Sequence, residues 1–388
     1  MASTTCAIST AMTSASCANL VELGVYVHVP FCGHRCPYCT FYQELPRRAD
    51  VDAYAAALGR EWALRKVEEP ITTLFFGGGT PGILSCEHFS QIAAGLGIGP
   101  SFKPVEWTVE FSPETVKFDK LLQLKDLGAT RLSIGVQSFA KKTLGTLGRR
   151  QGMEKIIRAI DLAKNAGFSL NLDLIFCVPG QTLAEWKDDL RRTIDFAPDH
   201  ISTYVLTGEN FGKFAKLRHS ATAGERFCRV GWDILQNAGY EHYEVSNFAR
   251  PGHRCRHNLN TWRMGSWLGL GPAAASQWQG RRFRNVANLR RWLEGIGVGQ
   301  PREEEIQPLT DKILLEDALI FALRTRDGID RRVFAERHGK IFFHHLPLLE
   351  CWTARRWLEE RGDRLCVTDA GLLLADALGL EILLMNSA

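Results

Sequence analysis

The sequence predicts an α/β protein with a parallel sheet, followed by a smaller, mainly helical domain. Two observations lead to this fold class. Six short runs of β-branched and apolar residues alternate with segments of helical periodicity, and several of those segments end at a glycine such as Gly128 or Gly167. Repeated βα units of this kind form parallel strands. The pattern alone fits both a closed barrel and an open, doubly wound sheet.

The predicted elements follow one another in a regular order. Strands are expected at Val25–Val29, Thr73–Phe76, Trp107–Phe111, Arg131–Val136, Leu170–Ile175 and Ile201–Leu206. Helices are expected at Val51–Lys66, Cys86–Leu96, Pro113–Leu127, Met153–Ala166 and Thr182–Phe196. The C-terminal region predicts helices at Asp311–Leu323, Arg331–Arg337 and Leu346–Arg361, a strand at Arg364–Val367 and a last helix from Asp369.

The composition of the 388-residue chain is that of a soluble globular protein, with 45% hydrophobic and 23% charged residues. The formal net charge of +4 is too small to imply a nucleic-acid or membrane partner, although transient membrane association stays open. Eleven cysteines, an odd number, argue against a secreted disulfide framework, so we expect the cytoplasm. Residues 1–21 carry no Lys or Arg and are expected to form a disordered tail. No run of 18 apolar residues predicts a transmembrane segment.

Three cysteines, Cys32, Cys36 and Cys39, directly follow the first predicted strand. Thiolates at C-x3-C-x2-C spacing can hold one iron–sulfur cluster and leave one iron without a cysteine ligand. Zinc is the alternative, with His28 or His34 as the fourth ligand, but zinc fingers usually split their ligands into two pairs. The spacing therefore favours an iron–sulfur cluster.

Polar residues gather where the other predicted strands end. Three glycines at residues 77–79 and Thr80 follow the second strand, Glu110 and Gln137 come at the ends of the third and fourth, and Asp173 is in the fifth. In parallel α/β folds the carboxyl ends of the strands carry the chemistry. Each residue taken singly could be a solvated loop group or a structural ion pair, but their common register indicates a site.

These motifs resemble the radical S-adenosylmethionine (SAM) superfamily, and Y-x-H-x-P-F-C at residues 26–32 resembles its branch of oxygen-independent coproporphyrinogen III oxidases and HemW-type heme chaperones. The resemblance implies a partial (β/α)6 barrel, with a 4Fe–4S cluster on the three cysteines. It also implies SAM binding by Tyr26, Tyr38, Gly78, Gly79, Thr80, Glu110, Gln137, Arg149 and Asp173. The usual L-G-R-x-H reads Leu147-Gly-Arg-Arg-Gln151 here, so the family's histidine is missing.

A second group of candidates follows the sixth strand. His242, His253, Cys255, His257 and Trp262 could form a heme site or be ordinary loop residues. The H-N-x-x-Y-W motif of HemW-type chaperones resembles residues 257–262, with Thr261 in place of tyrosine, and implies His257 as a heme ligand. Nearby arginines at 281, 282 and 284 could meet heme propionates or form a solvated basic face.

Phe41 discriminates between the two members of the branch. The oxidases resemble C-x3-C-x2-C-x-C, whereas this chain has Phe41 where the fourth cysteine would be, as in the chaperones. The resemblance therefore implies a heme chaperone that carries a SAM-bound cluster and passes heme to an unknown acceptor, with respiratory proteins one class to consider. The alternative is an oxygen-independent coproporphyrinogen III dehydrogenase.

We expect four segments: the tail at 1–21, a radical SAM core at 22–245, a HemW-like extension and linker at 246–308, and a C-terminal helical domain at 309–388. The linker is placed at Gly295–Pro308 because it holds prolines and a run of glutamates. The last segment resembles a winged helix. Its candidate recognition helix balances arginines with glutamates, so no nucleic-acid partner is expected.

Overall fold

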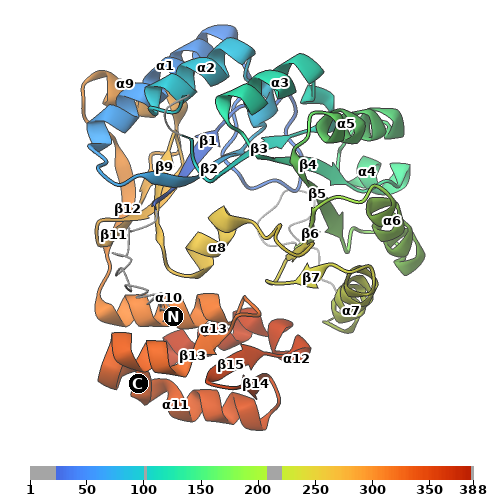
Figure 1. Ribbon diagram of the computed structural model, residues 1–388, viewed down its shortest axis with the longest axis vertical. Helices are drawn as coiled ribbons and strands as arrows, with labels where there is room; N and C mark the ends of the chain where they lie inside the picture. The colour runs from blue at the N-terminus through green and yellow to red at the C-terminus, as the bar shows by residue number, and fades with distance from the viewer. Residues whose placement is uncertain (1–22, 100–102, 208–220, 386–388) are drawn as a thin grey trace, which may run out of the picture.

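The computed structural model describes residues 23–99, 103–207 and 221–385. The tail expected at 1–21 lies outside these ranges. Six parallel strands form the centre of one large sheet, and they lie side by side in chain order (Figure 1). They are β1 (Leu23–Val29), β2 (Ile71–Gly78), β3 (Glu106–Phe111), β4 (Arg131–Gln137), β5 (Ser169–Phe176) and β6 (His200–Val205). The six predicted strands are confirmed, with ends that differ by two residues at most.

Helices cover the outer face of these strands (Figure 1). They are α1 (Arg48–Arg65), α2 (Cys86–Gly95), α3 (Phe118–Leu127), α4 (Lys141–Thr146), α5 (Met153–Asn165), α6 (Leu183–Asp195) and α7 (Ala221–Asn237). Capping boxes at Ser85 and Thr182 begin α2 and α6, because each hydroxyl accepts a backbone N–H that the first helical turn leaves unpaired. The expected helix at Pro113–Leu127 is split into a 3-10 turn and α3.

Further strands extend the sheet at both ends. β9 (Ser266–Leu270) pairs in parallel with β1, and β10 (Ala275–Trp278), β11 (Arg281–Asn285) and β12 (Glu303–Pro308) continue it in antiparallel fashion. β8 (Asn247–Ala249) and β7 (Glu241–His242) lie beyond β6. The sheet curves into a partial barrel and does not close between β12 and β7, which confirms the fold class expected from the resemblance.

The expected linker at Gly295–Pro308 is instead part of the folded core. It contains the end of α9 (Leu289–Gly297) and all of β12. Its acidic run resembles a solvated linker in the sequence, but Glu303 accepts hydrogen bonds from Arg65 and Arg281, and Glu305 accepts one from Arg284. Ion pairing to residues far away in the chain therefore turns a charged segment into a strand.

The C-terminal domain lies beside the partial barrel (Figure 1). It comprises α10 (Asp311–Ala322), β13 (Ile329–Asp330), α11 (Arg331–Ala354), β14 (Leu358–Arg361), β15 (Arg364–Val367), α12 (Asp369–Leu372) and α13 (Ala375–Leu384). The predicted strand at Arg364–Val367 is confirmed, but the helix expected at Leu346–Arg361 is wrong at its end. Residues 358–361 pair with β15 as a hairpin, because Gly362 (φ 59°) permits a tight turn.

A short helix, α8 (Arg256–Trp262), lies against the strands from inside, at the ends opposite those that carry the cysteines. The carboxylate of Glu106, the first residue of β3, accepts hydrogen bonds from the amides of Arg256 and His257, both at 3.0 Å. The helix also packs closely on β1, because a Cβ atom added at Gly24 would lie 3.3 Å from the His257 ring. The helix therefore covers the amino-terminal end of the partial barrel. Within the described ranges, no helix is both long and apolar enough to cross a membrane.

Candidate functional site

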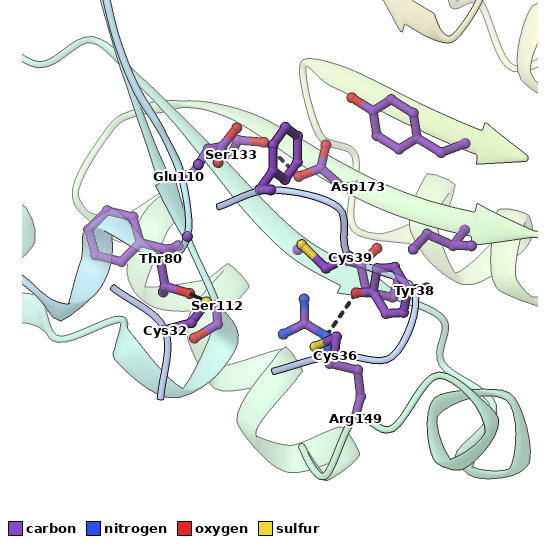
Figure 2. Close-up of a pocket in the computed structure, with 18 of the residues that line it drawn as sticks. Cys32, Cys36, Tyr38, Cys39, Thr80, Glu110, Ser112, Ser133, Arg149 and Asp173 are labelled. Atoms are coloured by element: carbon purple, nitrogen blue, oxygen red, sulfur yellow. Dashed lines mark hydrogen bonds between the residues drawn. The ribbon is translucent and has the colours of Figure 1, made fainter. Parts of the chain in front are cut away.

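A cavity of about 860 Å³ opens at the carboxyl ends of the parallel strands. This volume lies within the range of roughly 300–1,000 Å³ that is usual for small-molecule sites. The loop after β1 contributes the three cysteines, and the ends of β2 to β6 contribute polar side chains (Figure 2). Of the residues expected to bind the cluster or SAM, those that line it are Cys32, Cys36, Tyr38, Cys39, Gly78, Gly79, Thr80, Glu110, Gln137, Arg149 and Asp173.

The cysteine loop is held in place by hydrogen bonds on both sides. The amide of Cys32 donates to the carbonyl of Glu44 at 3.0 Å, and the amide of Glu44 donates to the carbonyl of Pro30 at 2.7 Å. Among the sulfurs, Cys32 Sγ lies 3.1 Å from Thr80 Oγ1, and Cys39 Sγ accepts from Gln43 Nε2 at 2.6 Å. The loop therefore presents its thiols to the cavity on a fixed backbone.

The chemistry of this donor set suits an iron–sulfur cluster. Three thiols are soft ligands, and all three face one cavity. Burial raises the pKa of Cys32 and Cys39, so the positive charge of bound iron would have to draw off their protons. In the part of the chain that the structure describes, no group of three or more His, Cys, Asp or Glu side chains is placed to hold a single ion.

The glycines after β2 have a different role from the one expected of them. The resemblance implies that they contact SAM, whereas in the structure the amide of Gly79 donates to the Val29 carbonyl and the amide of Thr80 donates to the Phe31 carbonyl, both at 2.8 Å. The Gly78 amide donates to the Glu110 carboxylate. An added Cβ at Gly79 would lie 2.6 Å from the Phe31 oxygen. The absence of side chains thus lets the end of β2 approach the cysteine loop closely, and backbone hydrogen bonds from this segment hold the loop in place.

Glu110 and Asp173 place two carboxyl groups in the cavity. Burial, followed by the nearby Asp173 charge, raises the pKa of Glu110 to about 8. Burial also raises the pKa of Asp173, although Asp173 accepts hydrogen bonds from Ser133 Oγ at 2.7 Å and Asn171 Nδ2 at 2.8 Å. Two cavity-lining carboxyls with raised pKa values indicate a site suited to a ligand with positive charge and hydroxyl groups.

Gln137 and Arg149 face the same space from the end of β4 and from the loop after α4. Gln137 has φ 68°, which is uncommon for a residue with a side chain. Arg149 Nε donates to Tyr38 Oη at 3.1 Å, so this cation is tied to the residue that precedes Cys39 (Figure 2). Tyr26 is the exception among the expected residues: it does not line the cavity, and its hydroxyl lies 3.1 Å from His28 Nδ1.

The sequence prediction missed the floor of the cavity. Arg131, Ser133, Asn171 and Ser202 line it from the first half of β4, β5 and β6, and none of them was assigned to the site from the sequence. The sequence does contain a pattern that points to it, because alternate residues of a strand lie on the same face. Residues 131, 133, 135 and 137 of β4 all line the cavity, and none of them is a large apolar residue.

The structure places the expected heme residues away from the cysteines. His257 is 7% exposed, its Nδ1 lies 3.0 Å from Thr73 Oγ1, and its ring packs on Phe75. Burial, followed by the Arg131 charge, lowers the pKa of His257 to about 4. Of the motif, only Asn258 reaches the cavity, while the Trp262 ring contacts Phe321 of the C-terminal domain edge to face. The motif therefore belongs to the opposite end of the barrel.

The alternative heme residues and the arginine cluster also have partners. The His242 ring stacks on Phe248, His253 lies against Ser169, and Cys255 is buried beside Glu106. The three arginines of β11 are ion-paired with Glu303, Asp317 and Glu305. These ion pairs favour the structural interpretation of the basic cluster.

Comparisons with known proteins agree with this geometry. A model of the Radical SAM superfamily matches residues 26–193, and a model of the HemN C-terminal domain matches residues 309–374. Proteins named heme chaperone HemW are similar over most of their length. The one from Synechocystis is 34% identical over 89% of this chain and 88% of its own, and the one from Escherichia coli is 33% identical over 94% and 99%.

A solved structure shows the same fold. Coproporphyrinogen III oxidase (HemN) from Escherichia coli superposes with a TM-score of 0.81 over 93% of this chain and 90% of its own, at 24% identity. Identity this low establishes the fold alone. The level and coverage of identity with the chaperones establish the family: the chain belongs to the HemW heme chaperone family of the radical SAM superfamily.

Proposed function

We propose that this protein binds heme and passes it to an acceptor protein, and that it carries a 4Fe–4S cluster with SAM bound at the open iron. One observation carries the cofactor part of the proposal. Three thiols from a single loop line the same cavity as Glu110, Gln137, Arg149 and Asp173, which come from four other segments of the chain. Kinship with the HemW chaperones supports the heme part.

Each polar group has a role that its chemistry suits. Cys32, Cys36 and Cys39 would hold the cluster. SAM would chelate the iron that has no cysteine ligand through its amino and carboxylate groups. Arg149 would pair with the SAM carboxylate, in an orientation that its hydrogen bond to Tyr38 supports. Asp173, Glu110 and Gln137 would accept hydrogen bonds from the ribose hydroxyls and the amino group. Gly78, Gly79 and Thr80 would contact SAM where they line the cavity, while the amides of Gly79 and Thr80 support the cysteine loop.

SAM binding tests these assignments. We expect Glu110→Ala and Asp173→Ala each to weaken SAM binding about 10- to 150-fold, which corresponds to roughly 1.5–3 kcal/mol for one contact to a charged group. Asp188→Ala is the control, because this carboxylate pairs with Arg192 on the exposed face of α6. Calorimetry on the cluster-loaded protein measures all three. If both cavity variants keep wild-type affinity, the two residues are not part of the SAM site.

Heme binding is proposed at His257, with Asn258 and Trp262 beside it. Nδ1 is engaged by Thr73, so Nε2 is the nitrogen for iron. Since the imidazole is only 7% exposed, heme can reach it only when α8 moves away from β1 and β2. The proposal therefore includes an open state of α8 as well as the closed one described above.

Heme titration tests the ligand. Alanine variants at His242, His253, Cys255 and His257 are compared by their Soret spectra, because the axial ligand sets the spectrum of the iron. The loss should be confined to His257→Ala. Wild-type spectra and affinity in all four variants, together with coproporphyrinogen III turnover by the purified protein, would replace the chaperone function by the oxidase alternative.

The setting of the protein is proposed on chemical grounds. Nine cysteines in the described residues are all free thiols, which suits a reducing compartment, and we propose the cytoplasm. The acceptor is proposed to be a hemoprotein, with respiratory proteins the first class to test. Incubation of the heme-loaded chain with apo-acceptors, followed by separation and heme spectra, would identify it.

A further inference from the structure

A continuous chain of hydrogen bonds connects the two ends of the barrel. It begins at Asp173 in the cavity, which accepts from Asn171 Nδ2 at 2.8 Å. Asn171 Oδ1 lies 2.6 Å from His200 Nδ1, and His200 Nε2 lies 2.7 Å from the Tyr243 hydroxyl. That hydroxyl accepts from the amide of Cys255 at 3.3 Å, one residue before α8 begins.

The chemistry of these groups allows one direction for the chain. Burial, followed by the Arg131 charge, lowers the pKa of His200 well below its ordinary value, so the ring is neutral, with one N–H donor and one acceptor nitrogen. Because Asn171 Oδ1 can only accept, His200 Nδ1 donates to it. His200 Nε2 must then accept the proton of the Tyr243 hydroxyl. Each donor therefore points toward Asp173, and every link depends on the orientation of the next.

A second connection runs beside the first. Arg131 is 4% exposed and lines the cavity floor. Burial alone would lower its pKa, but nearby acidic groups, which include Glu106 and Asp173, raise the pKa of Arg131 overall. Glu106 in turn accepts from the first two amides of α8. The position of α8 is thus linked to Asp173 through both a hydrogen-bonded and an electrostatic contact.

We infer that His200 and Tyr243 are positioning residues that couple the SAM cavity to α8, so that SAM and heme bind with opposing effects on each other. The inference rests on the proposed function, because it takes Asp173 as a SAM contact and His257 as the heme ligand. When SAM binds at Asp173, it adds a hydrogen-bonding partner to the chain that runs to the Cys255 amide while α8 is packed against the strands. Heme at His257 requires that α8 leave its position, which breaks the link between Tyr243 and the Cys255 amide. Each ligand therefore favours a different state of α8.

Thermodynamic linkage gives the test. The cluster-loaded protein is titrated with heme, followed by Soret absorbance, without SAM and with saturating SAM. We expect SAM to weaken heme binding by a factor of about 5 to 150, the range of ordinary coupling between two sites. Heme must then weaken SAM binding by the same factor, which calorimetry on the wild-type protein checks without any substitution.

Two tyrosines in the same region provide a matched pair of variants. Tyr243→Phe removes the hydroxyl that joins His200 to the Cys255 amide. Tyr240→Phe removes a buried hydroxyl outside that chain, which donates to the carbonyl of Pro198 at 2.7 Å and also contacts the Arg250 side chain. The coupling factor should fall close to one in Tyr243→Phe and keep its wild-type value in Tyr240→Phe. A structural role alone would lower the affinity for heme or SAM without changing their dependence on each other.

The possible outcomes separate the two proposals. If heme and SAM both bind to the wild-type protein but neither changes the affinity for the other, or if SAM strengthens heme binding, the inference is wrong and the proposed function stands. Equal loss of coupling in both tyrosine variants would also overturn it, since the effect would then not pass through Tyr243. Failure of the wild-type protein to bind heme at all would refute the proposed function itself.

Discussion

Glu110 should make the stability of the ligand-free protein depend on pH in a way that a single substitution removes. Burial and the Asp173 charge raise its pKa from 4.5 to about 8 in the folded chain. Between these two values the unfolded chain releases the proton while the folded chain keeps it. The folded state therefore loses stability as the pH rises through this window, and the loss is complete above about pH 8.

The size of the effect follows from the two pKa values. Each pH unit in the window corresponds to about 1.4 kcal/mol, so the full span amounts to about 5 kcal/mol at most. Glu110→Gln cannot titrate. The difference in unfolding free energy between this variant and the wild type should therefore shift in favour of the variant by about 1.4 kcal/mol per pH unit between pH 5 and pH 8. Urea unfolding of the ligand-free chains at a series of pH values measures it.

Two further variants sharpen this experiment. Asp173→Asn removes the negative charge that is the second cause of the raised Glu110 pKa, and burial, the first cause, remains. The pH range over which Glu110 destabilises the folded chain should therefore narrow without disappearing. Glu185→Gln should change the pH dependence of stability in the opposite direction, because hydrogen bonds from the backbone and side chain of Thr182 lower the pKa of Glu185. Its stabilisation is present above the ordinary pKa of glutamate and is lost as the pH falls. A flat difference between Glu110→Gln and wild type from pH 5 to pH 8 would refute the assignment of a buried, protonated carboxyl.

Three more predictions test the loop and the sheet. Gly79→Ala should prevent stable cluster assembly, because the added Cβ would lie 2.6 Å from the Phe31 oxygen. Gly33→Ala, within the cysteine loop itself, should retain iron and sulfide, because its added Cβ would have nothing within 4 Å. The triple variant of Cys32, Cys36 and Cys39 to alanine should lose the iron and sulfide bound after reconstitution, and full retention would contradict the cluster assignment. Asn285→Ala should lower the unfolding free energy by about 1–3 kcal/mol, since it leaves the buried Glu61 and Arg65 without a shared partner, and an unchanged denaturation midpoint would contradict this.

Local patterns in the sequence carried the prediction of the central strands and the cysteine loop. The parallel strands are short segments rich in β-branched and apolar residues, and such segments are recognisable without tertiary information. The three cysteines are adjacent in the chain, so their shared role is visible from spacing alone. Glu110, Gln137 and Asp173 could be assigned to one site because parallel strands bring their carboxyl ends to one edge.

The features that were missed depend on contacts between distant segments. β12 is a charged strand whose glutamates find arginines from α1 and β11, and nothing within residues 303–308 reveals those partners. The resemblance assigns Gly79 and Thr80 to the SAM site alone. Their amides also donate to the carbonyls of Val29 and Phe31, and this depends on how closely two loops approach. His257 lies at the end of the barrel opposite the cysteines for the same kind of reason, because its position is fixed by Glu106 and Thr73.

The polar interior of this barrel is itself evidence about function. A purely structural barrel would fill the space between β3, β4, β5 and β6 with apolar side chains, because burying polar groups costs free energy unless every one finds a partner. Here Asn171, Ser202, His200 and Tyr243 satisfy one another, and they connect the cavity to a helix on the far side. A fold shared with an oxidase does not decide what this interior does. In the proposed function SAM and heme would bind at the two ends of the route from Asp173 to the start of α8, so this hydrogen-bonded route is the part of the interior that could connect the two ligands.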